Sequence, residues 1–353
     1  ENRQTVAHDL TNRDLKRLPP SSLEPGSPAR AAWLDEAPER VEIEVNGRAQ
    51  TLVGDDLTRW KYQRYMQDYL ACVQGVDDGV GEVLDYLDRT GLAKNTVVIY
   101  STDNGWYLGD LGMYDKRFMY EPGLHVPLLA RGPGIKAGHV PAQFVGNIDL
   151  APTFTEVAGL AWAKTGMAES PGRSLTDIFR VDRSGQINPA RDHVLIGMER
   201  HDIGRPGDVG YPIRGIVKGG HLYLENYEPS RWPACNPETG YLNVDAGATK
   251  SFILDAHRAN AADPFWALCF GRRPAVEFYD LKSDRDCVKN LATVPATAAQ
   301  RAALKATMET ALKAQGDPRM FGQGAIFDRY PHSNNANINF YERYMKGEKI
   351  SAG

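Results

Sequence analysis

No long hydrophobic run occurs in this chain, although 42% of its 353 residues are hydrophobic. A membrane-spanning helix needs roughly 20 consecutive apolar residues, so the sequence predicts no membrane span. The polar residues 1–4 also lack the apolar stretch of a signal peptide. The formal net charge is −4, whereas binding to nucleic acids or membrane surfaces depends on a basic face. Charge therefore supports neither kind of partner.

Cysteines are few, and their spacing is wrong for a zinc site. The four lie at positions 72, 235, 269 and 287, with no C-x-x-C pair. Cys72 falls on the apolar face of an expected helix, so we expect a free, buried thiol there. The other three cysteines allow one disulfide, but the sequence does not choose the pair.

The length of the chain favours two units, because 353 residues exceed what one compact core usually holds. Residues 1–58 are rich in Pro and polar residues, with a short hairpin expected at 41–47. A long helix with one buried apolar stripe is expected from Leu57 to Gly91. A change of texture near residue 180 divides an α/β part, 1–180, from a C-terminal subdomain, 181–353.

Residues 97–101 read as a buried strand of a mainly parallel sheet, because most of them are β-branched or aromatic. Asp103, Asn104 and Gly105 follow directly, where open α/β sheets collect their ligand sites. Gly105 makes it easy for the chain to leave strand geometry, so that both polar side chains can aim at one point. Their oxygens suit Ca²⁺ or Mg²⁺. The alternative is an ordinary Asn-Gly turn.

A polar segment with Lys116 follows, at 108–121, and then a second strand at 126–130. The order of a strand, Asp-Asn-Gly, a lysine segment and a second strand resembles the C-terminal portion of type I sulfatases of the alkaline phosphatase superfamily. The resemblance implies an alkaline-phosphatase-like α/β fold, with a mostly parallel sheet flanked by helices and a C-terminal α+β subdomain on a small antiparallel sheet. It also implies Asp103 and Asn104 as ligands of Ca²⁺, or of Mg²⁺, and Lys116 as a catalytic cation on the sulfate. The alternative for Lys116 is a surface lysine paired with a nearby aspartate.

Strands dominate the second half, where a small antiparallel sheet is expected. One amphipathic helix follows, with a candidate capping box at Thr297 and Gln300 and a C-terminal glycine at Gly316. Earlier, Asp149 is the expected N-cap of a helix in a pattern that also resembles the sulfatases. The expected strands are 193–198, 213–217, 221–224 and 276–281. The apolar residues of the helix are Leu304, Met308 and Leu312.

A second polar group consists of Glu199, Arg200, His201, Tyr211 and Arg214. In these residues the chain resembles the heparan N-sulfatase (sulfamidase) branch of the family. Its carboxylate and imidazole suit sugar hydroxyl or amino groups, and its arginines suit carboxylates. The alternative is an edge loop with ordinary surface charges. The expected substrate-binding residues are Glu199, Arg200, His201, Tyr211 and Arg214.

The nucleophile of the family is not found in this sequence. Type I sulfatases use a formylglycine made from Cys or Ser in Cys/Ser-x-Pro-x-Arg, upstream of the Asp-Asn-Gly strand. Cys235-Asn236-Pro237 has the start of such a motif but no Arg, and it lies in the wrong subdomain. We therefore expect the formylglycine in an N-terminal portion of the same enzyme, and we expect the 353 residues alone to be inactive.

The resemblance implies hydrolysis of sulfated sugars in glycosaminoglycan degradation, with heparan-type glucosamine N-sulfate or O-sulfate first. A periplasmic, secreted or lysosomal location follows by the same resemblance. Two alternatives remain. One is a phosphonate or phosphodiester hydrolase of the same superfamily, and the other is a non-catalytic sulfatase-like subunit.

Overall fold

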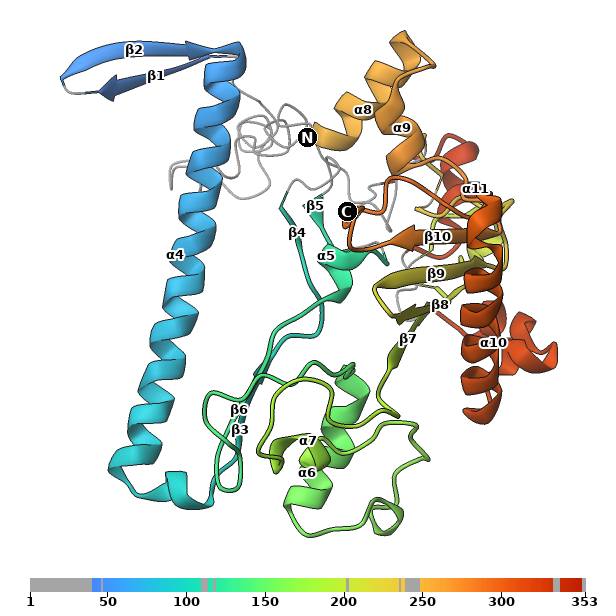
Figure 1. Ribbon diagram of the computed structural model, residues 1–353. Coiled ribbons are helices and arrows are strands. Elements are labelled where there is room, and N and C mark those ends of the chain that lie inside the picture. Colours follow the sequence, from blue (N-terminus) through green and yellow to red (C-terminus); the bar gives the residue numbers. More distant parts are fainter. Residues whose placement is uncertain are drawn as a thin grey trace.

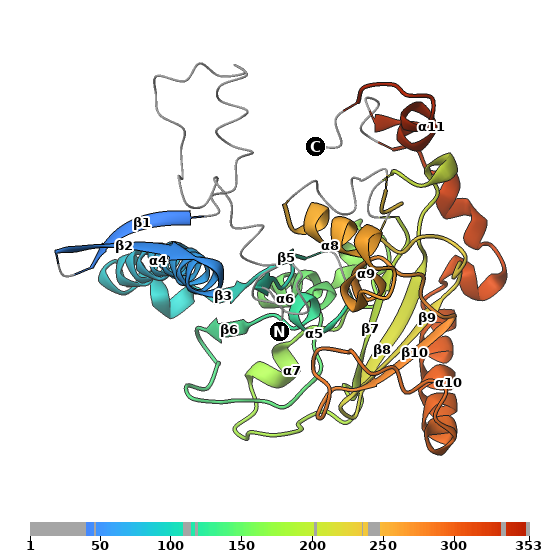
Figure 2. The same ribbon diagram turned by 90° about the horizontal axis from the view of Figure 1, so that it is seen from above.

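The structure is a computed structural model, and it shows a long helix standing beside a sheet-based C-terminal half (Figure 1). The long helix α4 carries a hairpin at one end and leads into β3 at the other (Figure 1). Seen from above, α4 again lies to one side of the sheet formed by β7 to β10 (Figure 2). The described residues are 40–45, 47–108, 114–116, 119–200, 203–234, 236–238, 248–332 and 337–350.

The N-terminal hairpin and the helix after it are confirmed. Strand β1 (Arg40–Val45) pairs antiparallel with β2 (Arg48–Val53), and α4 (Gly54–Arg89) follows at once. The expectation of a buried apolar stripe along α4 was wrong for most of its length, since Val76 is 50% exposed. Cys72 is a free thiol as expected, but it is exposed. The reason is that the described residues cover α4 near its two ends, where Tyr65 packs with Leu108 and Leu84 lies by β3 and β6. They leave Val73 and Val76 between them exposed.

Strand β3 (Val98–Ser101) pairs antiparallel with β6 (Leu128–Arg131). Each strand is therefore present where the sequence predicted one, but the parallel pairing expected for residues 97–101 is not the one observed. Residues 102–127 lie between the two strands and are long enough for a parallel crossover, so the spacing in the sequence does not set the direction of pairing. The strand is also less buried than expected, because Tyr100 is 40% exposed.

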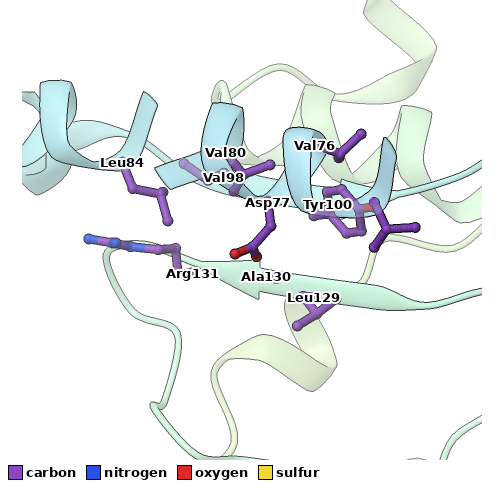
Figure 3. Close-up of a pocket in the computed structure, with 10 residues that line it drawn as sticks. Val76, Asp77, Val80, Leu84, Val98, Tyr100, Leu129, Ala130 and Arg131 are labelled. Atoms are coloured by element: carbon purple, nitrogen blue, oxygen red, sulfur yellow. The ribbon is translucent and has the colours of Figure 1, made fainter. Parts of the chain in front are cut away.

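The α4–β3–β6 face is the apolar surface made by Val73, Val76, Val80 and Leu84 of α4, Val98 and Tyr100 of β3, and Leu129 and Ala130 of β6. Side chains from the helix and from both strands border a common hollow of about 380 Å³ (Figure 3). Leu129 is 60% exposed there. Large apolar side chains that remain open to solvent mark a surface suited to further contacts.

The C-terminal sheet has the strand order β10-β9-β8-β7, and all three ladders are antiparallel. One face of this sheet packs on helix α10. The contact is made through Leu304, Met308 and Leu312 of the helix, which are all buried as predicted. The predicted capping box was wrong: the Thr297 hydroxyl donates to the carbonyls of Leu291 and Val294 instead. The bounds are β7 (His193–Met198), β8 (Ile213–Lys218), β9 (His221–Asn226), β10 (Val276–Asp280) and α10 (Ala298–Ala314).

A buried arginine joins α6 (Leu150–Val157) and α7 (Thr176–Phe179). Arg191 is 1% exposed and lies 3.0 Å from an Asp149 carboxylate oxygen and 3.2 Å from one of Asp177. Asp149 occupies the predicted N-cap position of α6, but its carboxylate binds Arg191 and the N–H of Arg173 rather than the helix. Buried charges need such pairing to offset lost solvation.

The other described elements are short, apart from α8. No helix among the described residues is long and apolar enough to cross a bilayer. The remaining helices and strands are β4 (Tyr107–Leu108), β5 (Tyr114–Asp115), α5 (Glu121–Leu124), α8 (Ala248–Ala259), α9 (Pro264–Cys269) and α11 (Phe340–Met345), with 3₁₀ turns at Leu92–Asn95, Asn147–Asp149, Trp162–Lys164, Pro206–Asp208, Pro295–Thr297, Pro318–Phe321 and Gly324–Arg329.

Candidate functional site

The polar end of β3 is held in place by hydrogen bonds from a neighbouring segment. The Asn147 side-chain N–H donates to the carbonyl oxygens of Thr102 and Asp103, at 3.0 and 3.3 Å. The Asp103 carboxylate is exposed, and it accepts from the Thr102 hydroxyl at 3.4 Å. Asn104 donates its side-chain N–H to the Gly105 carbonyl at 2.7 Å, which leaves the amide oxygen as its acceptor atom. Asn147 was not among the predicted site residues.

Gly105 is needed for a different reason from the one expected. Its φ is not in the left-handed region, but an added Cβ would lie 1.9 Å from the Pro122 carbonyl oxygen. The Gly105 N–H donates to the Gly123 carbonyl at 2.9 Å. The chain after Asn104 therefore runs directly against α5, and glycine is the residue that permits this approach.

We expect Gly105→Ala to loosen this contact and to lower the free energy of unfolding by about 1–3 kcal/mol, because the clash is with backbone. Chemical denaturation of the two proteins measures the difference. Gly134→Ala is not a suitable control because its φ is positive. Gly75→Ala on α4 serves as the contrast: nothing lies within 4 Å of the place its Cβ would take, so it should raise stability by up to about 1 kcal/mol rather than lower it. Equal stability of Gly105→Ala and the parent protein would contradict the close approach.

A small hairpin brings Lys116 back beside Trp106, a few residues after the end of β3. Strand β4 pairs antiparallel with β5, with Tyr107 opposite Asp115. Lys116, the next residue, therefore lies beside Trp106, with its Nζ 5.3 Å from the centre of the indole ring. A cation over an aromatic face is held electrostatically. The β4–β5 hairpin therefore places the exposed ammonium group of Lys116 near Trp106, which is two residues after Asn104.

The donor atoms at the end of β3 fit a hard divalent cation but do not complete its shell. One carboxylate and one carboxamide are oxygen ligands of the type that Ca²⁺ prefers, and Ca²⁺ takes 6–8 of them. Among the described residues no group of three or more His, Cys, Asp or Glu side chains is arranged to hold a metal. Asp103 and Asn104 therefore suit two positions of a larger ligand set.

Glu199 and Arg214, both predicted to contact substrate, form a largely buried cluster with Asp317 and Arg319. The Glu199 carboxylate accepts from Arg214 at 2.6 Å and from Arg319 at 2.6 and 2.7 Å. Arg214 also binds Asp317 and the carbonyls of Met198 and Ile213. Burial opposes the charged form of Arg214, but the Asp317 hydrogen bond and the Glu199 charge raise its pKa overall.

The five N–H donors of Arg214 are matched by five such bonds, so this arginine is engaged inside the protein. Asp317 and Arg319 are separated from Glu199 by more than a hundred residues, and no local pattern pointed to them. We infer that Glu199 and Arg214 shape the loop between β7 and β8.

Two other predicted residues of this group are also placed by the structure. Arg200 donates to the backbone carbonyls of Tyr330 and Asp208. Tyr211 is 1% exposed and belongs to a core cluster that also contains Tyr107 and Tyr120. Burial, followed by the charge of a nearby glutamate, raises the pKa of Tyr211. His201, a predicted substrate-binding residue, and Cys235 lie outside the described residues.

Comparison with known proteins finds relatives of part of this chain. Residues 22–160 match the family described as Sulfatase. Human N-acetylglucosamine-6-sulfatase is 43% identical over 220 residues, which cover 62% of this chain and 35% of the relative. The N-acetylglucosamine-6-O-sulfatase of Bacteroides thetaiotaomicron is 40% identical over 162 residues, covering 45% and 27%. A sulfatase-family region therefore lies within residues 22–160 of this chain.

Solved sulfatase structures show the same fold. One, described as a complex with its substrate D-glucosamine-2-N,6-O-disulfate, has a TM-score of 0.54 and 27% identity, covering 76% of this chain and 44% of that one. Another, from work on glycosaminoglycan metabolism by Bacteroides thetaiotaomicron, has a TM-score of 0.51 at 19% identity, covering 94% and 61%. The alkaline-phosphatase-like sulfatase fold predicted from the sequence is confirmed. The chain spans 27% and 35% of the two curated relatives.

Proposed function

We propose that this chain supplies two metal ligands and a sulfate-binding lysine to an enzyme that hydrolyses the 6-O-sulfate of glucosamine-type sugars. The observation that carries the proposal is the return of Lys116 to Trp106, which lies two residues after Asn104 in the chain. When bound, a divalent cation, with Ca²⁺ first and Mg²⁺ second, polarises the sulfate and favours an anionic nucleophile. Lys116 places a second positive charge where negative charge develops on the sulfate oxygens.

The nucleophile is proposed to be a formylglycine in an N-terminal portion of the same enzyme, outside these 353 residues. The support for this is the absence of the Cys/Ser-x-Pro-x-Arg motif from the sequence. On this proposal the 353 residues bind and orient sulfate but do not cleave it. The complete enzyme is proposed to lie outside the cytoplasm, in the periplasm, in the lysosome or secreted. The support for this location is that one relative is named an extracellular sulfatase.

The names of the relatives favour a 6-O-sulfate over the N-sulfate that the sequence left open. Two are N-acetylglucosamine 6-sulfatases, and the structural relative is described with a substrate sulfated at both positions. A heparan-type saccharide contains such glucosamine units. In this proposal Glu199, Arg214 and the buried Tyr211 hold the loop between β7 and β8 from within. Arg200 and His201 are the residues proposed to contact the sugar.

The test compares substrates on the enzyme that contains this chain together with its nucleophile. N-Acetylglucosamine 6-sulfate, glucosamine N-sulfate and a phosphonate monoester are assayed side by side with added Ca²⁺. We expect kcat/KM on the 6-O-sulfate to exceed the other two by at least about 100-fold, because a site built around polar substrate groups strongly rejects analogues. Preference for the N-sulfate or the phosphonate overturns the assignment, and no turnover on any of them favours a non-catalytic subunit.

A further inference from the structure

A buried glutamate in the C-terminal sheet lies against the start of α5, the helix that Gly105 contacts. Glu277 and Tyr279 are two residues apart on β10, so both face the same side of the sheet. Glu277 is 3% exposed, and its carboxyl group accepts from the Tyr279 hydroxyl at 2.6 Å and from the Asn226 side chain at 2.8 Å. The Tyr120 hydroxyl donates to the same carboxyl group at 3.4 Å.

Tyr120 connects this glutamate to the end of β3 through backbone hydrogen bonds. It immediately precedes α5, and its carbonyl accepts the N–H groups of Gly123 and Leu124 at 2.9 and 3.1 Å. The Gly123 carbonyl in turn accepts the N–H of Gly105 at 2.9 Å. Since Gly105 follows Asn104 directly, a continuous series of contacts runs from the sheet to the proposed metal ligands.

We propose that Glu277 is a positioning residue that acts through Tyr120 and α5 to set the orientation of Asp103 and Asn104. The proposal rests on the proposed metal site and extends it to a residue that does not touch the metal. Partners behind the direct ligands orient them, and their loss typically weakens metal binding.

Further contacts hold α5 against the sheet at the same place. The rings of Tyr120 and Tyr279 meet edge to face, with centroids 6.0 Å apart. The buried thiol of Cys287 lies against the backbone N–H of Glu121, the first residue of α5, and burial raises the pKa of that thiol to about 12. Burial, together with the Glu277 charge, also raises the pKa of Tyr120, so its hydroxyl remains a donor at neutral pH.

The opposite face of the sheet offers a matched control. There the buried Tyr223 hydroxyl donates to Glu225, two residues along β9, at 2.8 Å. Tyr223 packs in the cluster that contains Leu304 and Met308 of α10, and Glu225 pairs with Lys305 of the same helix. Tyr223→Phe removes a buried tyrosine–glutamate hydrogen bond from the same sheet without touching α5.

The experiment uses Tyr120→Phe, Glu277→Gln and Tyr223→Phe in the complete enzyme. Hydrogen exchange of the backbone around Gly105 and Gly123 is measured without metal, and Ca²⁺ affinity is measured by calorimetry. Tyr120→Phe and Glu277→Gln are expected to exchange about fivefold faster there, the equivalent of one net hydrogen bond. They are also expected to bind Ca²⁺ about 10-fold more weakly. Tyr223→Phe is expected to change neither quantity.

Three results overturn the proposal. Exchange that is the same in Tyr120→Phe, Glu277→Gln and the control shows that the sheet does not hold α5. Faster exchange with unchanged Ca²⁺ affinity shows that the connection does not orient the metal ligands. Full Ca²⁺ affinity in an Asp103→Ala enzyme would remove the proposed metal site and with it the role of Glu277. The hydrogen exchange measured without metal would still report separately on the contact between the sheet and α5.

Discussion

Asp103→Ala in the complete enzyme should abolish Ca²⁺ binding and sulfate hydrolysis together. Asp103 is the charged ligand that β3 offers, and its backbone is fixed by the Asn147 side chain. Loss of the cation removes several kcal/mol of transition-state stabilisation, so turnover should fall by roughly 1,000-fold. Calorimetry and steady-state assays on N-acetylglucosamine 6-sulfate measure the two effects.

Two further variants separate the role of the charge from general damage. Asp103→Asn keeps a ligand oxygen but loses the charge, so excess Ca²⁺ should restore part of its activity. Asp88→Ala removes an exposed carboxylate that pairs with Arg131 at the opposite end of the β3–β6 ladder, and it should behave like the parent enzyme. Normal turnover of Asp103→Ala would remove the basis of the proposed function.

Residues 1–353 expressed alone should show no sulfatase turnover and should self-associate. The α4–β3–β6 face leaves Val76 and Leu129 at 50% and 60% exposure, and β3 has β6 as its ladder partner among the described strands. Exposed apolar surface beside an open strand edge favours association. Light scattering over a concentration series and a sulfate-release assay give the two readouts.

A substitution on this face distinguishes an accidental apolar surface from one that the rest of the enzyme covers. Val76→Gln should reduce self-association of residues 1–353 at little cost in stability. In the complete enzyme the same change should lower the melting temperature, because a buried polar group without a partner costs about 1–3 kcal/mol. A monomeric 353-residue chain that hydrolyses a sulfate ester would show that the nucleophile lies within it.

The C-terminal subdomain was the part most open to prediction from the sequence. Strands β7 to β10 and helix α10 were placed within a few residues, because alternating and helical apolar patterns are local signals. The same reasoning failed for the exposure of Cys72 and Val76. A periodic stripe shows which face of a helix is apolar, but whether that face is covered depends on other segments.

The candidate site was predictable where its residues are neighbours in the sequence. Asp103, Asn104 and Lys116 follow one strand in an order that resembles the sulfatases. The close approach of Gly105 to α5 was not predictable, because it depends on how the chain returns through Pro122. The partners of Glu199 and of Tyr120 were missed for the same reason: Arg319 and Glu277 lie far along the chain and carry no local pattern.

The length of α4 has a consequence for the order of folding. At 1.5 Å per residue its 36 residues span roughly 54 Å, and nothing lies within 4 Å of where side chains would stand at Gly75, Gly79 and Gly81 in its middle. Each interior glycine costs about 1 kcal/mol relative to alanine, so intrinsic propensity does not sustain such a helix. Its central turns should therefore gain full helicity only when another part of the enzyme docks on them. Far-ultraviolet circular dichroism recorded during refolding would then report the joining of the two parts.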